Sequence, residues 1–187
     1  MPVSFSVSNF KSNFALGGAR PTLFQVTLTA PSIVGGIDLT ASPFLVSSAN
    51  LPSSDLGLIS VPYFGRVLKL AGDRTFPTWS TTVLNDENFI IRNSLETWSN
   101  AINQMRGNAR LSTGLSIAYK TDATVTQYDK LGNELRTYRF EGLYPGRIQA
   151  IDLGWDRTDR IEEFVVDWEY DNWVLDSGVT GSIGNQG

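Results

Sequence analysis

The sequence predicts a mainly β protein with one long helix. Apolar and polar residues alternate in short segments separated by Gly, Pro, Asn and Asp, which is the pattern of half-buried strands. Only one stretch, about residues 86–105, instead repeats apolar residues at steps of three and four. With 187 residues and 41% hydrophobic content, the chain is long enough to bury one substantial core.

The chain up to residue 51 predicts four strand segments. Residues 23–29 alternate cleanly, which places Phe24, Val26 and Leu28 on one face. Residues 31–42 predict a turn around Gly35 and Gly36 with a short strand on each side, and residues 44–51 predict a further strand.

A long hairpin is predicted next, over roughly residues 54–73, followed by a strand at 78–85. Its two arms are residues 58–62 and 66–72. Pro62 and Gly65 interrupt an otherwise apolar run, and such punctuation is unusual for a segment buried wholly in its own core. We therefore expect part of this hairpin to face a partner.

The helix at 86–105 carries one apolar stripe. Asn85 or Asp86 can cap its start, and Gly107 suits its exit. The stripe is expected to face the sheet and consists of Ile91, Leu95, Trp98, Ile102 and Met105.

Strands return in the C-terminal half. Residues 123–143 predict two strands joined at 129–133, where Gly132 supplies a positive φ. A turn is predicted at 144–146, a strand at 148–155 and one long alternating strand at 161–175. The Gly- and Ser-rich residues 177–187 predict a flexible tail.

The composition narrows the possible functions. Nineteen acidic and fifteen basic residues give a net charge of −4, which argues against tight nucleic-acid binding through phosphate neutralisation. The absence of cysteine excludes thiolate chemistry, and the absence of histidine removes the commonest general base and transition-metal ligand. The sequence contains no run of eighteen apolar residues and no secretory signal pattern, so we expect a protein that stays where it is made, without a membrane span.

Candidate chemistry is limited to carboxylates and aromatic rings. Pairs such as Asp73 with Asp86, or Glu162 with Glu163, could serve glycoside hydrolysis, but solvated acids are the better interpretation. One strand face could gather Ca²⁺ through Asp167, Glu169 and Asp171. Ion pairs of these acids with Arg136 and Arg139 are the favoured alternative. The aromatic side chains could stack on sugars or bases, but packing in the core is the better explanation. We therefore expect no enzymatic activity, no cofactor and no metal.

Several segments resemble the tail tube proteins of contractile-tailed bacteriophages, inner tube subunits related in fold to R-type bacteriocin and type VI secretion tubes. The run "AGDRTF", residues 71–76, followed by Trp79, is the most diagnostic. The resemblance covers about residues 19–173 and rests on the segments 19–28, 51–86, 94–103, "GLYPGRIQAIDLGWD" and "IEEFVVDWEYDNW". It implies an N-terminal arm at 1–18, a tail tube domain at 19–176 and the tail at 177–187.

For the fold, the resemblance implies two antiparallel sheets packed as a small barrel-like sandwich, with the flanking helix and the extended hairpin. For function, it implies a structural virion protein, made in the host cytoplasm, whose hexameric rings stack into the hollow tube that conducts genomic DNA. The implied partners are the sheath protein, a baseplate or tube initiator, the tape measure protein and the tail terminator. Double-stranded DNA would pass without tight binding.

The resemblance also assigns roles to residues. An inter-ring contact is expected at the hairpin residues Val61, Pro62, Tyr63, Phe64, Gly65 and Arg66. Asp73 and Arg74 are expected to form a charge pair that fixes register. Asp167, Glu169 and Asp171 are candidate lumen acids, because negative charge would repel a duplex that carries one charge per about 1.7 Å.

Two alternatives remain. A tube of a DNA-free contractile injection device would share the fold and differ in cargo. A carbohydrate-binding or carbohydrate-cleaving β-sandwich, such as a receptor-binding tail component, would use the aromatic and acidic residues instead.

Overall fold

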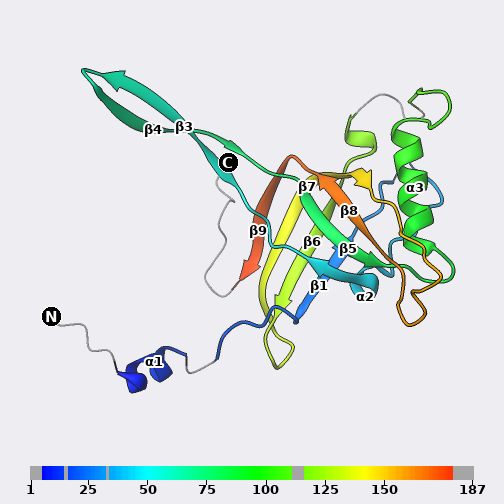
Figure 1. The fold of residues 1–187 in the computed structure, drawn as a ribbon, viewed down its shortest axis with the longest axis horizontal. Coiled ribbons are helices and arrows are strands. Elements are labelled where there is room, and N and C mark those ends of the chain that lie inside the picture. The colour runs from blue at the N-terminus through cyan, green and yellow to red at the C-terminus, as the bar shows by residue number, and fades with distance from the viewer. Residues whose placement is uncertain (1–5, 15–16, 33, 111–115, 179–187) are drawn as a thin grey trace.

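The computed structural model describes residues 6–14, 17–32, 34–110 and 116–178. It is a mainly β structure in which a sandwich of antiparallel strands carries one helix on its flank and one long hairpin that projects away from it (Figure 1). No helix in these ranges is long and apolar enough to cross a membrane. The prediction of a β sandwich with a flanking helix and an extended hairpin is confirmed.

The chain begins with α1 (Val7–Asn13), on an arm that lies apart from the sandwich (Figure 1). The remaining elements are β1 (Phe24–Leu28), α2 (Ser42–Leu45), β2 (Val46–Ala49), β3 (Asp55–Tyr63), β4 (Arg66–Thr75), β5 (Trp79–Leu84), α3 (Ile90–Ile102), the 3₁₀ turn η1 (Ser116–Ala118), β6 (Thr121–Tyr128), β7 (Glu134–Ile148), β8 (Glu163–Glu169) and β9 (Asn172–Gly178).

Strand β7 belongs to both layers of the sandwich. Its first part pairs with β6 and β9, and β1 extends this first sheet beyond β6. Its last part, from Tyr144, pairs with β8, and β5 and β2 complete the second sheet. Gly142, with φ +71°, lies between the two parts. The strand path starts at β1 and ends at β2, so the described sandwich is open and not a closed barrel.

The core lies between the two sheets and under α3. The largest fully buried side chains include Trp98 of α3, Trp168 of β8 and Phe140 of β7. The Trp79 ring stacks on Phe140 with 4.2 Å between centroids, which joins the two layers. Val26 and Leu28 are buried and Phe24 packs against the core, as the alternation in residues 23–29 predicts.

The helix is shorter than its pattern. The helix begins at Ile90 with Phe89 as its N-cap residue, and not at residue 86, although Asp86 accepts a hydrogen bond from the Ile90 backbone N–H. Ile91, Leu95 and Trp98 are buried and Ile102 is partly buried, but Met105 lies beyond the helix and is exposed. The prediction for Met105 is wrong because the helix ends at Ile102. Beyond the helix, the Met105 N–H donates a hydrogen bond to Asn100 Oδ1.

Several predicted strands and turns also differ from those in the structure. The described part of 31–42 contains no strand, and a single helical turn, α2, precedes β2. Pro145 does not end β7, because a register shift between Pro145 and Arg147 accommodates it, so the predicted turn at 144–146 is wrong. Residues 149–162 form a loop in place of the predicted strand at 148–155.

The predicted strand at 161–175 is in fact two strands. It is interrupted at Tyr170 and Asp171, where the Asp171 N–H donates to the Glu141 carbonyl, and passes from the last part of β7 to its first part. The second strand, β9, continues to Gly178, and its Ser177 is in register with Thr137. The first two residues of the predicted flexible tail are therefore strand residues, and residues 179–187 lie outside the described ranges.

Candidate assembly surface

The hairpin of β3 and β4 is a two-stranded sheet of its own that extends from the sandwich (Figure 1). Its strands are aligned from Asp55 opposite Thr75 to Tyr63 opposite Arg66. All residues of both strands are exposed except Gly72, which is half-buried. The hairpin thus contributes almost nothing to the core of its own chain.

The turn at the tip is built from Phe64 and Gly65. Their φ angles are +43° and +77°, as a two-residue type I′ turn requires. Glycine adopts this conformation freely, whereas a bulky aromatic residue rarely does. The Phe64 side chain is 89% exposed and packs edge-on against Tyr63, with 4.6 Å between ring centroids. The tip therefore presents an aromatic pair to solvent at some cost in backbone strain.

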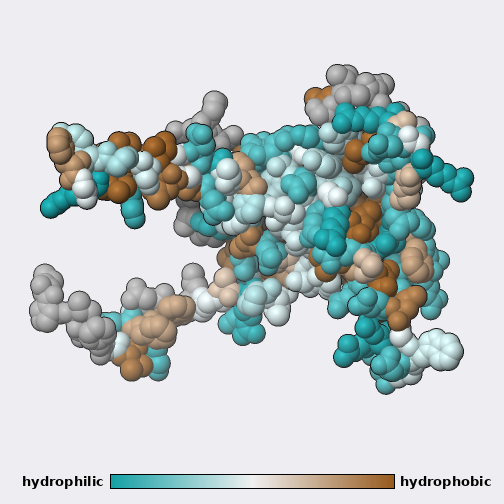
Figure 2. All heavy atoms as spheres, turned by 45° about the horizontal axis from the view of Figure 1, so that its top comes forward, coloured by the Kyte–Doolittle hydropathy of each residue, from teal (hydrophilic) through white to brown (hydrophobic). Residues whose placement is uncertain are grey.

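One face of the hairpin is almost entirely apolar. Residues directly opposite in an antiparallel pair point to the same side, and side chains alternate along each strand. One face accordingly contains Ile59, Val61, Tyr63, Leu68 and Leu70, together with Arg66. The other face mixes Ser60 and Lys69 with Pro62 and Val67. Figure 2 shows hydrophobic atoms along the projecting hairpin.

This apolar strip is best understood as a protein interface. While the chain is alone, the hydrophobic side chains of the projecting hairpin stay exposed to water, which is unfavourable. Contiguous exposed apolar surfaces of this kind mark contact sites with other proteins. The strip includes the predicted contact residues Val61, Tyr63 and Arg66. Phe64 and Gly65 form the turn at its end, and Pro62 lies on the other face. Their part in an inter-ring contact remains a prediction.

The predicted charge pair at Asp73 and Arg74 is not made within the chain. The two residues are neighbours in β4, and Arg74 instead donates a hydrogen bond of 2.6 Å to Ser54 Oγ. Among the ion pairs of the described residues, none joins Asp73 to Arg74. A role in register would have to involve another copy.

The predicted lumen acids are spread over two environments. Asp167 and Glu169 lie on β8, on the opposite face from the buried Phe164, Val166 and Trp168. Asp167 accepts from Ser80 Oγ and Gln149 Nε2, and Glu169 accepts from Thr78 Oγ1. Asp171 lies in the turn after β8 and pairs with Lys120 at 2.6 Å. Which of them faces a lumen remains a prediction.

The predicted arginine partners of these acids are wrong. Arg139 lies 3.5 Å from both Glu141 and Asp176 instead, because β7 pairs there with β9 and not with β8. Arg136 donates to Tyr138 Oη. Within the described residues, no group of three or more acidic side chains is placed to hold a metal ion.

Two of the four candidate catalytic carboxylates have structural partners. Asp86 accepts from the Ile90 N–H at the start of α3, and Glu162 accepts from the Asn85 side-chain amide at 2.9 Å. Asp73 lies on the projecting hairpin. Glu162 and Glu163 both line one hollow beside the loop between β7 and β8, whereas Asp73 and Asp86 do not line it.

The sequence did not predict a second group of exposed apolar residues. Leu153, Trp155 and Ile161 lie in the loop between β7 and β8, where a strand was predicted through residue 155. The run "DLGWDRTDR" could have indicated this loop, since Gly and Asp are typical of turns.

Comparison with known proteins shows which family this fold and surface belong to. The family described as "Phage tail tube protein" matches residues 19–176. The chain is 32% identical over 156 residues to the "Tail tube protein gp19" of Enterobacteria phage T4, covering 83% of this chain and 90% of the relative. It is 30% identical over 174 residues to the "Tail tube protein" of Serratia phage KSP90, covering 91% and 97%.

Solved structures agree on the fold. A chain in the tube-terminating cap of the anti-feeding prophage has a TM-score of 0.62 at 14% identity, covering 86% of this chain and 92% of that one. A chain of the anti-feeding prophage baseplate has a TM-score of 0.60 at 13% identity, covering 88% and 98%. With the family match over most of the chain, this protein belongs to the phage tail tube protein family and is a structural component of the virion.

Proposed function

We propose that six copies of this chain close into a ring, that rings stack into a hollow tube inside a contractile sheath, and that genomic DNA passes through the tube on ejection. The observation that carries the proposal is the β3–β4 hairpin. It displays an apolar face that its own chain leaves uncovered. In a tube of identical subunits, a second copy of the chain would cover this face of each hairpin.

The open sandwich supports the same assembly. Strands β1 and β2 are the two ends of the strand path in the described residues. Open strand edges invite uncontrolled pairing, and enclosing them in a ring is one way to remove that hazard. Lateral contacts then close on themselves, whereas the contact of one ring with the next is head-to-tail and continues as a filament.

Charge favours passage of DNA over its retention. Each chain has a net charge of −4, so a ring would be acidic overall. If the outer face of β8 lines the channel, Asp167 and Glu169 would repel the duplex, which allows fast transit because nothing binds it tightly. In this function the chain acts as a structural subunit and not as an enzyme. Its partners would be the sheath, a baseplate or initiator, the tape measure and the terminator.

The tube of a DNA-free injection device is the second candidate. The anti-feeding prophage structures share the fold, but at 13–14% identity they say nothing of cargo. The family match and the two phage relatives favour the DNA-conducting tube. A sugar-binding sandwich is less favoured, because Trp79, Trp98 and Trp168 are buried in the core and Trp155 is the one largely exposed tryptophan among the described residues.

Negative-stain electron microscopy of the purified protein at high concentration, with and without a baseplate fraction as nucleus, tests the proposal. We expect six-fold rings or hollow tubes. A protein that remains monomeric even with the nucleus would contradict it. A reconstruction of the tubes would then show whether the channel is acidic, and a neutral or basic channel would contradict the proposed passage of DNA.

A further inference from the structure

The loop between β7 and β8, residues 149–162 and called here the β7–β8 loop, displays the most exposed aromatic side chain among the described residues. Trp155 has a relative exposure of 104%, and Leu153 and Ile161 are also largely exposed. Tryptophan is costly to leave in water and is enriched at the centres of protein interfaces. The loop is therefore a second candidate contact surface, separate from the hairpin.

Both ends of the loop are held firmly to the sandwich. At the start, Arg92 Nη1 donates to the Gln149 carbonyl and the Gln149 N–H donates to the Val165 carbonyl. At the end, the Asn85 N–H donates to the Glu162 carbonyl at 2.8 Å. A surface that is already ordered loses little conformational entropy when it binds, so the loop is well suited to act as a preformed receptor.

The interior of the loop is also ordered. The Arg157 N–H donates to the Gly154 carbonyl, and Arg157 Nη1 donates to the Asp152 carbonyl at 3.0 Å. These bonds close a turn around Trp155. The indole is thus presented by a defined turn.

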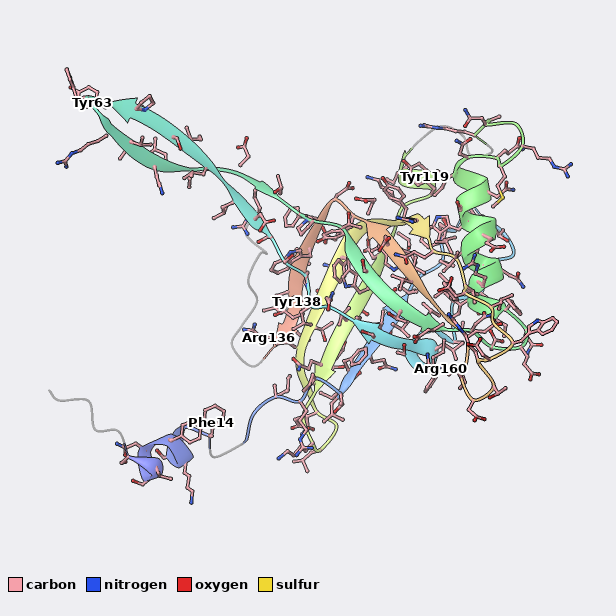
Figure 3. All side chains as sticks on the ribbon, viewed as in Figure 1. Phe14, Tyr63, Tyr119, Arg136, Tyr138 and Arg160 are labelled. Carbon is pink, nitrogen blue, oxygen red and sulfur yellow. The ribbon has the colours of Figure 1, made fainter. Side chains whose placement is uncertain are left out.

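The loop and the hairpin tip lie at opposite ends of the molecule. Figure 3 places Tyr63 at the far end of the hairpin and Arg160 of the β7–β8 loop on the other side of the sandwich. In Figure 1 the same loop is the orange segment below β8. When identical chains stack head to tail, the two surfaces that meet must lie at opposite ends of each chain. The hairpin and the loop satisfy this condition.

Their charges are complementary. The outer part of the hairpin, residues 56–72, contains Arg66 and Lys69 and no acidic residue, while Asp55, Asp73 and Arg74 lie at its base. Residues 149–163 contain five acidic and two basic residues, the acidic ones being Asp152, Asp156, Asp159, Glu162 and Glu163. Opposite charge around an apolar centre steers two surfaces together and fixes their register.

A hollow beside the loop offers a place for the tip. It is lined by loop residues, including Asp152, Arg160 and Glu162, and by Thr82 and Val165 of the second sheet. Its rim holds acidic groups next to the exposed Ile161. A tip that combines Arg66 with Tyr63 and Phe64 matches this mixture of charge and apolar surface.

We infer that the β7–β8 loop is the docking surface for the hairpin tip of a second copy of this chain in the adjacent ring. The inference rests on the proposed tube function and names the receptor for its axial contact. Trp155 and Leu153 cover the apolar face of the incoming hairpin, while the acidic residues of the loop pair with Arg66 and Lys69.

Cysteine cross-linking tests the inference cleanly, because the native chain has no cysteine. Val67→Cys on the hairpin and Thr158→Cys on the loop are combined in one chain, assembled into tubes and treated with a short bis-maleimide. A second, independent pair is Lys69→Cys with Asp156→Cys. The control pairs Val67→Cys with Leu131→Cys, an equally exposed position in the β6–β7 turn.

We expect denaturing gels to show ladders that extend beyond six chains for the two test pairs and not for the control. A hairpin that contacts a neighbour in the same ring would close the ladder at six, which would overturn the inter-ring docking. If both test variants form normal tubes and neither pair cross-links, the docking would be overturned and the tube function left intact. Failure of the wild type to form rings or tubes, seen by electron microscopy, would overturn the proposed function and the docking with it.

Discussion

The indole N–H of Trp168 donates a hydrogen bond of 2.9 Å to the Thr81 hydroxyl in the core. Trp168 lies on β8 and Thr81 on the neighbouring β5, and both side chains are buried. Tryptophan can only donate this bond, so a buried indole needs an acceptor close by. The buried hydroxyl of Thr81 is therefore explained by Trp168, which lies two residues from the position directly opposite it.

Replacing Thr81 by Val keeps the shape of the side chain and removes the acceptor. We expect the free energy of unfolding to fall by about 1–3 kcal/mol, the cost of a buried group left without its bond. Urea denaturation followed by tryptophan fluorescence measures the change. Thr82→Val, on the opposite face of β5, is the matched control and is expected to change stability by less than about 0.5 kcal/mol. Equal effects of the two substitutions would contradict the role of the bond.

Gly142 provides a second stability test, at the point where β7 passes from one sheet to the other. Its φ is +71°, and a Cβ added there would lie 2.3 Å from Asp171 Oδ2. Gly142→Ala is expected to cost about 1–3 kcal/mol from the positive φ, and further free energy because Asp171 must leave its ion pair with Lys120.

The control for that substitution is Gly132→Ala. Gly132 also has a positive φ, of +85°, but an added Cβ would meet nothing within 4 Å. Thermal unfolding of both variants separates strain from steric conflict. If Gly142→Ala were no more destabilising than Gly132→Ala, the contact with Asp171 would be unimportant.

The elements that could be predicted from the sequence are those whose structure depends on residues close together along the chain. The alternation in β1 and the stripe Ile91, Leu95 and Trp98 are read directly from neighbouring residues, and both predictions hold. The turn at Gly132 is equally local, and its positive φ confirms it. The two sheets and their packing came from the resemblance to tail tube proteins and not from periodicity.

The errors arose where distant parts of the chain decide the structure. Pro145 predicts a turn, but β7 pairs with β8 on both sides of it, and a shift in register between Pro145 and Arg147 accommodates the proline. The prediction pairs Arg139 with the acids of β8, whereas the first part of β7 lies beside β9, which supplies Asp176. Pro62 and Gly65 indicated the exposed hairpin, whereas the alternation in residues 148–155 favoured a strand over the loop that the Gly and Asp residues around the exposed Trp155 indicate.

The Phe64 turn offers a way to separate backbone strain from side-chain contact. Asparagine tolerates a positive φ and forms a favoured type I′ pair with the following Gly65. We expect Phe64→Asn to slow hydrogen exchange at the Tyr63 and Arg66 amides of the free subunit by several-fold while reducing tube formation. Unchanged tube yield would show that the Phe64 ring is not part of the contact.

The aromatic pair at the tip can be removed altogether. Tyr63→Ser with Phe64→Ser should leave the circular dichroism spectrum and the melting temperature unchanged, because neither side chain touches the core. Tube formation should be lost, since buried aromatic groups dominate interface energies. Leu131→Ser, which removes a similarly exposed apolar side chain elsewhere, should assemble normally. Normal tubes from the double variant would refute the hairpin as an assembly element.

Charge reversal connects the hairpin to the loop of the next ring. Arg66→Glu with Lys69→Glu places negative charge against an acidic loop, and we expect the critical concentration for assembly to rise about tenfold or more, which corresponds to about 1.4 kcal/mol. Adding Asp156→Lys and Asp159→Lys to the same chain should restore assembly, because the attraction is rebuilt with its signs exchanged. Light scattering at low and high salt measures both effects, and salt should weaken the attraction in the wild type and in the rescued variant alike. A loop reversal that fails to rescue the hairpin variant, while each variant keeps a native circular dichroism spectrum, would place the partner of Arg66 and Lys69 somewhere other than the β7–β8 loop.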